Sequence, residues 1–101
     1  MVVFVNQLTL TGDAEELLRI YRSVAAYFAR QPGLIRYQLV QALDDPRVFF
    51  NIAEWTDTAS FRQATRQEQF QQALRVSQVS IGDPHLCTAV FEGRPAAVEP
   101  T

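Results

Sequence analysis

The sequence has no lysine, one cysteine and one histidine among its 101 residues. A single cysteine, Cys87, cannot form an intramolecular disulfide or a cysteine-rich metal site, and this usage is typical of a reducing cytoplasm. A single histidine, His85, cannot build a usual zinc centre. We therefore expect a cytoplasmic protein without a metal site.

Excess basic charge and long apolar runs are also missing. The net charge is −2 and the isoelectric point is near 5.2, so the sequence lacks the basic surface that binds a phosphate backbone. No apolar run reaches the length of a membrane span, and residues 1–10 alternate polar with apolar instead of forming a signal peptide. Glycine-rich phosphate loops and nucleotide-cofactor motifs are absent. Nucleic acid, a membrane and a nucleotide cofactor are therefore not expected as partners.

The hydrophobic pattern predicts four strands and two helical regions in one domain. In chain order these are a strand over 2–11, a helix over 13–28, strands over 34–42 and 48–55, a helical region from Asp57 or Thr58 with a break near 65–67, and a strand over 86–91. This β-α-β-β-α-β order is that of ferredoxin-like α+β folds, with a four-stranded antiparallel sheet and both helices on one face. We expect residues 1–92 to form the domain and residues 93–101 to be a flexible tail.

The strand over 48–55 is apolar on both faces. Alternation places Val48, Phe50 and Ile52 on one face and Phe49, Asn51, Ala53 and Trp55 on the other. Two helices cover only one face of a sheet, and we expect the face with Trp55 to be the uncovered one. A second copy of the chain in a homodimer, a ligand, or both would then cover it. We expect the site described next in a cavity shared between two subunits, and an indole packed beneath its own helices could not line such a cavity.

Asn51 and Trp55 are the main candidates for a ligand site. They lie roughly 13 Å apart along one strand face, with the small Ala53 between them, which suits a flat and partly polar aromatic ligand. The alternative is that Trp55 packs at the dimer interface and Asn51 bonds a neighbouring chain. Asn6, in the middle of the first strand, either donates to a ligand or makes a structural hydrogen bond.

The stretch from Asn51 to Phe61, NIAEWTDTASF, followed by Phe70, resembles the antibiotic biosynthesis monooxygenase family. The resemblance implies a homodimeric α+β barrel. In one branch it also implies oxidation of aromatic polyketide anthrones to quinones by molecular oxygen, without metal, flavin or nicotinamide. In that branch an Asn and a Trp are separated by three residues, with a Tyr six positions after the Trp and an Arg twenty after it. Asn51, Trp55 and Arg75 match these positions and are the expected catalytic residues, whereas Phe61 replaces the Tyr.

The expected substrate is a small aromatic molecule, and its expected contacts are Asn6, Phe49, Phe61 and Phe70. In the haem-degrading branch of the same superfamily a Trp and an iron-binding His occupy the positions of Ala64 and Leu74 here, so haem degradation is disfavoured. Two alternatives stay open: a dimeric module that binds an aromatic ligand without catalysis, and a polyketide cyclase-like protein. No residue is identified from the sequence as the catalytic base.

Overall fold

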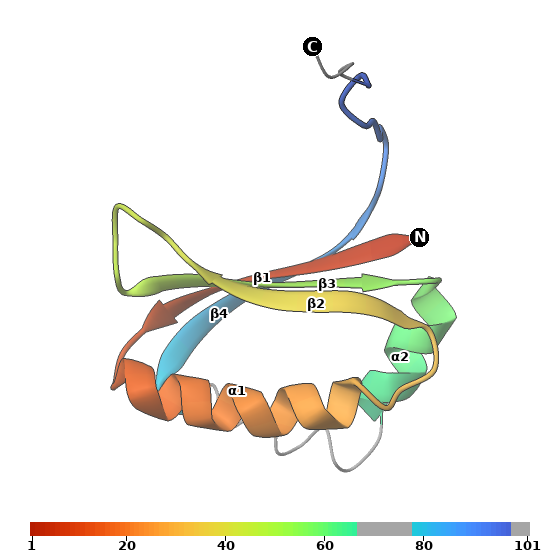
Figure 1. Ribbon diagram of the computed structural model, residues 1–101. Coiled ribbons are helices and arrows are strands. Elements are labelled where there is room, and N and C mark those ends of the chain that lie inside the picture. Colours follow the sequence, from red (N-terminus) through yellow and green to blue (C-terminus); the bar gives the residue numbers. More distant parts are fainter. Residues whose placement is uncertain (67–77, 98–101) are drawn as a thin grey trace.

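A computed structural model describes residues 1–66 and 78–97 of the chain (Figure 1). The elements are β1 (Val2–Leu10), α1 (Ala14–Phe28), β2 (Leu34–Gln41), β3 (Val48–Trp55), α2 (Thr58–Arg66) and β4 (Ser80–Thr88). The strands form one sheet in the order β2-β3-β1-β4, and every neighbouring pair is antiparallel. The predicted ferredoxin-like α+β architecture is confirmed.

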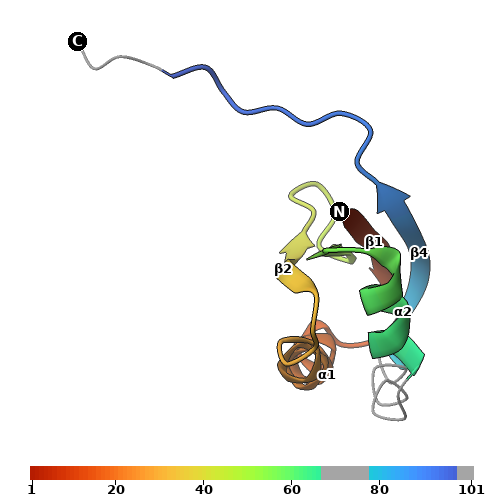
Figure 2. The ribbon, with the colours of Figure 1, turned by 90° about the vertical axis from the view of Figure 1, so that its right-hand side faces the viewer.

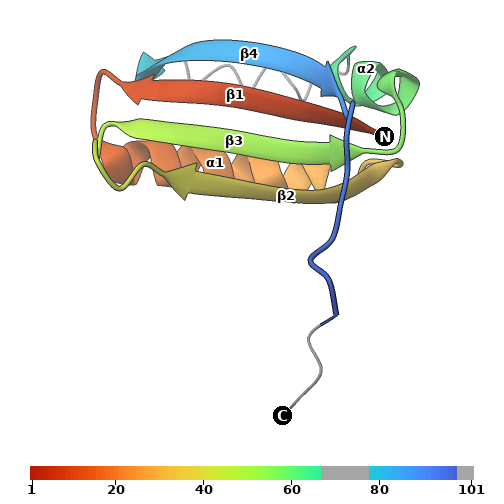
Figure 3. The same cartoon turned by 90° about the horizontal axis from the view of Figure 1, so that it is seen from above.

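Both helices lie against the same face of the sheet (Figures 1 and 2). Figure 3 shows the opposite face, with α1 visible behind the strands. We call this second side the helix-free face; it carries Val3, Val5, Val40, Phe50 and Ile52, each partly exposed. None of the helices in the described part of the chain is both long and apolar enough to cross a membrane.

Local side-chain contacts explain where several elements begin. Asp13 precedes α1, and its carboxylate accepts a hydrogen bond from the Glu15 backbone N–H at 3.2 Å. Asp57 precedes α2, and its carboxylate accepts from the Ser60 backbone N–H at 2.7 Å. This contact stabilises the charged form, so the pKa of Asp57 lies below its usual value. The sequence therefore located both helix starts through the residues that cap them.

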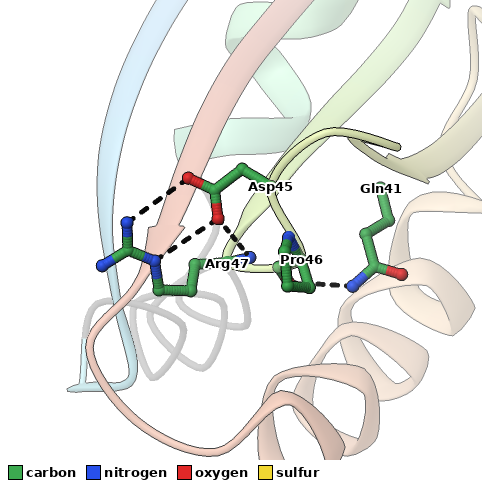
Figure 4. A network of polar contacts seen from close by, with 4 residues as sticks. All are labelled: Gln41, Asp45, Pro46 and Arg47. Atoms are coloured by element: carbon green, nitrogen blue, oxygen red, sulfur yellow. Dashed lines mark hydrogen bonds and ion pairs between the residues drawn. The ribbon is translucent and has the colours of Figure 1, made fainter.

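The turn between β2 and β3 is held by its own polar side chains (Figure 4). The Asp45 carboxylate accepts from the Arg47 backbone N–H at 3.0 Å and pairs with the Arg47 guanidinium, and the Gln41 amide donates to the Pro46 carbonyl at 2.8 Å. These bonds fix the hairpin that places β3 between β2 and β1.

The last strand differs from the prediction. A strand is expected over 86–91, but β4 runs from Ser80 to Thr88 and contains Gly82 and Pro84. Pro84 is tolerated because β4 is an edge strand, where a missing N–H need not interrupt the sheet. Pairing with β1 along its whole length, from Leu10↔Ser80 to Val2↔Thr88, compensates for the weak local strand propensity.

The predicted orientation of β3 is wrong. Trp55 is only 1% exposed and lies beneath the helices of its own chain. Its ring contacts Phe28 of α1 and Phe61 of α2, with a centroid distance of 5.8 Å to each. Phe49, Asn51 and Ala53 share this helix-covered side, and Phe50 and Ile52 occupy the helix-free face. A site open from Trp55 towards a second subunit is therefore excluded.

Candidate active site between the sheet and its helices

The helix-covered side of the sheet contains two apolar clusters with a polar band between them. One cluster is built on Leu8, Leu17 and Phe49, and the other on Ala53, Trp55 and Ala64. Along β1 and β3 the pair Asn6↔Asn51 lies between Leu8↔Phe49 and Phe4↔Ala53. Two carboxamides therefore lie directly opposite each other on neighbouring strands, with hydrophobic packing on both sides. We call Asn6 and Asn51 the amide pair.

Asn51 is oriented by helix α1. The hydroxyl of Tyr21 donates a hydrogen bond to Asn51 Oδ1 at 2.8 Å. Burial, with a smaller contribution from the neighbouring Tyr37, raises the pKa of Tyr21 to about 12. Tyr21 therefore keeps its proton, and remains a neutral donor, throughout the neutral and moderately alkaline range.

Asn6 is oriented by the edge strand β4. The backbone N–H of Asp83 donates to Asn6 Oδ1 at 2.9 Å. Gly82 lies beside this contact, and a Cβ at Gly82 would be 3.2 Å from Asn6 Oδ1, closer than ordinary van der Waals contact. The absence of a side chain at Gly82 therefore leaves the room that the Asn6 amide occupies.

Both amide oxygens already accept a hydrogen bond from the protein. No described residue accepts from Nδ2 of Asn6 or from Nδ2 of Asn51. Each carboxamide nitrogen carries two N–H donors, so the amide pair is a source of donors and needs an acceptor. A carbonyl or an anionic oxygen of a ligand satisfies that need, and two preorganised donors favour an oxygen on which negative charge develops.

Trp55 adds a further donor without a partner. Its indole Nε1 is buried and has no hydrogen-bond partner among the residues that the structure describes. An unsatisfied buried N–H costs on the order of 1–3 kcal/mol, so the presence of an unpaired indole N–H at this position needs an explanation. The ring packs edge-on against Phe61, whose own ring lies 5.2 Å from that of Phe4. Phe61 thus supplies an aromatic contact where the resembled branch has a hydroxyl.

The remaining predicted site residues divide into two groups. Phe49, an expected substrate contact, is buried with Leu8 and Leu17 and is part of the core. Phe70 and Arg75, an expected substrate contact and an expected catalytic residue, lie outside the described residues. The structure thus brings Asn6 next to Asn51, and Trp55 next to Phe61, on one side of the sheet.

Sequence reasoning missed Tyr21 and Gly82. Neither residue is among the candidates that the sequence pattern singled out. A hydroxyl on the helix face that packs against the sheet was the available signal for Tyr21, since such a group needs a partner there. Gly82 gave no comparable signal, because its role depends on the pairing of β4 with β1.

Within residues 1–66 and 78–97, no group of three or more His, Cys, Asp or Glu side chains is arranged to hold a metal ion. The described site is therefore made of amide, indole and phenol groups and aromatic rings. Such groups can donate hydrogen bonds to an oxygen atom of a largely apolar ligand.

Comparison with known proteins identifies the family and the fold. The sequence model of the antibiotic biosynthesis monooxygenase family matches residues 1–76. Deoxynogalonate monooxygenase of Streptomyces nogalater is 42% identical over 69 residues, which span 68% of this chain and 58% of that protein. SnoaB, a cofactor-independent oxygenase from the same species, is 36% identical with a TM-score of 0.85, covering 90% of this chain and 94% of that chain. PA3566 of Pseudomonas aeruginosa, at 22% identity and a TM-score of 0.76 over 89% and 94% of the two chains, shows the shared fold.

Proposed function

Because this chain belongs to the antibiotic biosynthesis monooxygenase family, we propose that it oxidises an anthrone-like aromatic polyketide to a quinone with molecular oxygen and no cofactor. The observation that supports the proposal is the amide pair, whose oxygens accept hydrogen bonds from protein donors and whose nitrogens donate to no described residue. The similarity to a cofactor-independent oxygenase supports the same reaction class.

The substrate itself supplies the electrons in this reaction. Loss of a proton from the carbon opposite the carbonyl converts an anthrone to an aromatic phenolate, which transfers an electron to oxygen. The two radicals combine to a peroxide on that carbon, and loss of water leaves the second carbonyl. The methylene group and O2 thus become a carbonyl and one water molecule, so no external reductant is needed.

The described residues favour the anionic form of such a substrate. Asn6 and Asn51 donate N–H bonds to the phenolate oxygen, and they are held in place before charge develops there. Trp55 and Phe61 contact the ring system, and the indole N–H donates to a second oxygen of the polyketide. The apolar clusters on both sides lower the polarity around the amide pair, which strengthens these hydrogen bonds.

The test is turnover of a model anthrone by chelator-treated protein, with oxygen uptake, the absorption spectrum and 18O incorporation recorded together. Asn51→Ala removes one preorganised donor, and we expect turnover to fall about 100-fold. Ser23→Ala, at an exposed position of α1, is the matched control and leaves turnover unchanged. Binding of the anthrone without oxygen uptake would instead identify a ligand-binding module, and ring closure of a polyketide without oxygen uptake would identify a cyclase.

We further propose that the chain acts as a homodimer through the helix-free face. Val5, Phe50 and Ile52 form an apolar surface there. The segment after β4 leaves the sheet on that same side (Figures 1 and 2), and it carries Val90 and Phe91, each 90% exposed. A second copy packed on this face covers both the sheet surface and the protruding segment.

Sedimentation velocity tests the dimer. Phe50→Asp places a charge in the apolar surface, and we expect it to convert a dimer to a monomer at micromolar concentration. Leu43→Asp, at a fully exposed position in the β2–β3 turn, is the control and keeps the wild-type mass. A monomeric wild-type protein, or a dimeric Phe50→Asp variant, contradicts this interface.

A further inference from the structure

We propose that Tyr21 is a positioning residue that holds the Asn51 carboxamide with its NH2 group towards the substrate, an inference that rests on the proposed oxygenase function. The contact that carries it is the hydrogen bond from the Tyr21 hydroxyl to Asn51 Oδ1, at 2.8 Å. Tyr21 comes from the middle of α1 and reaches across to the central strand β3.

A carboxamide has two orientations of nearly the same shape, which differ in whether oxygen or nitrogen faces a given neighbour. Only one of them presents N–H donors to a substrate oxygen. A phenol hydroxyl is a better donor than acceptor, because its oxygen lone pair is delocalised into the ring. Its partner is therefore the amide oxygen, and the Asn51 nitrogen is left to point elsewhere.

The environment of Tyr21 preserves this donor. Its side chain is half-buried against the sheet, and the raised pKa keeps the hydroxyl protonated where the reaction would be assayed. The same protonation makes Tyr21 unsuited to accept the substrate proton. The hydrogen bond and the protonation state of Tyr21 therefore both support a role in positioning Asn51.

Asn6 provides an internal comparison. Its carboxamide is oriented by the backbone N–H of Asp83, a donor on β4 that no side-chain substitution at position 21 removes. The two members of the amide pair are thus oriented by independent donors. Loss of the Tyr21 hydroxyl is expected to release the orientation of Asn51 and to leave that of Asn6 unchanged.

The experiment is a double-mutant cycle on anthrone turnover. Tyr21→Phe keeps the ring and removes only the hydroxyl, and we expect kcat to fall five- to tenfold with KM changed less than twofold. In the Asn51→Ala background, Tyr21→Phe should cause no further loss, since the group that it positions is gone. In the Asn6→Ala background it should cause its full loss. Equal losses in all backgrounds, or no loss in the wild type, would overturn the proposal.

NMR tests the positioning role of Tyr21 without requiring catalysis, so its result does not depend on the proposed function. Side-chain amide resonances in 15N NMR spectra report Asn51 and Asn6 directly. We expect Tyr21→Phe to shift or broaden the Asn51 NH2 signals and to leave those of Asn6 in place. An unchanged Asn51 signal refutes positioning even in an active enzyme. A changed signal in a protein inactive towards anthrones supports positioning and rejects only the proposed substrate.

Discussion

Trp55→Phe separates the stability role of the indole from its proposed role in the site. The Trp55 side chain is fully buried, and its Nε1 has no partner among described residues. The smaller ring leaves a gap of roughly 40 Å³, which at about 24 cal/mol per Å³ costs about 1 kcal/mol, and the lost transfer free energy is of similar size. Removing an unsatisfied N–H recovers about 1–3 kcal/mol. We therefore expect the free energy of unfolding to change by less than about 1 kcal/mol.

Urea unfolding followed by circular dichroism at fixed protein concentration measures this change. Fluorescence is unsuitable because Trp55 is the only tryptophan of the chain. Phe28→Leu is the matched control, since it removes volume from the same cluster without removing a polar atom. We expect Phe28→Leu to lower the free energy of unfolding by about 1–2 kcal/mol, more than Trp55→Phe does.

We expect the more stable variant, Trp55→Phe, to be the one that loses activity. Trp55→Phe removes an N–H that the site offers to the ligand, so we expect anthrone turnover to fall at least tenfold although the fold is retained. A loss of stability above 3 kcal/mol would refute the reasoning, because it would mean that the N–H is satisfied in the free protein. Unchanged turnover would remove the indole N–H from the proposed mechanism.

Three further predictions concern the surroundings of the site. Because the pKa of Tyr21 is raised to about 12, the unfolded tyrosine ionises first between pH 10 and 12. The free energy of unfolding should fall there by about 1–2 kcal/mol, which allows for solvent screening of this half-buried group. Urea titrations at pH 9 and 12 should show a smaller fall for Tyr21→Phe. Gly82→Ala places a Cβ 3.2 Å from Asn6 Oδ1, so we expect a several-fold loss of turnover with little change in melting temperature. Gly33→Ala should lower stability by at least about 1 kcal/mol in thermal unfolding, since Gly33 has φ 91° and its Cβ would collide with Ser60.

The sequence determined the architecture because the signals for it are local. Asp13 and Asp57 lie where the helices were expected to begin, and the strands expected over 34–42 and 48–55 leave a short turn between them, as in the hairpin of β2 and β3. The element order then defined a ferredoxin-like sheet with its helices on one side. The stretch from Asn51 to Phe61 identified the family, and the family model confirms it.

The tertiary structure decided which face of β3 meets the helices. Alternation separates Phe50 from Trp55, but both faces of the strand carry large apolar side chains, so hydrophobicity alone cannot say which one is covered. The decision comes from packing: Trp55 fits between Phe28 and Phe61, and Asn51 meets the hydroxyl of Tyr21.

Because this face of β3 packs against the helices, the candidate site lies in the interior of one chain and not at a subunit interface. Its contacts join residues far apart in sequence, such as Asn6 with Asp83 and Tyr21 with Asn51. A strand pattern specifies neighbours along the chain, whereas these partners exist only once helix α1 and strand β4 have packed against the sheet. Asn6, Asn51 and Trp55 were therefore recognisable as candidates from the sequence, whereas the roles of Tyr21 and Gly82 and the orientation of the amides were decided by the fold.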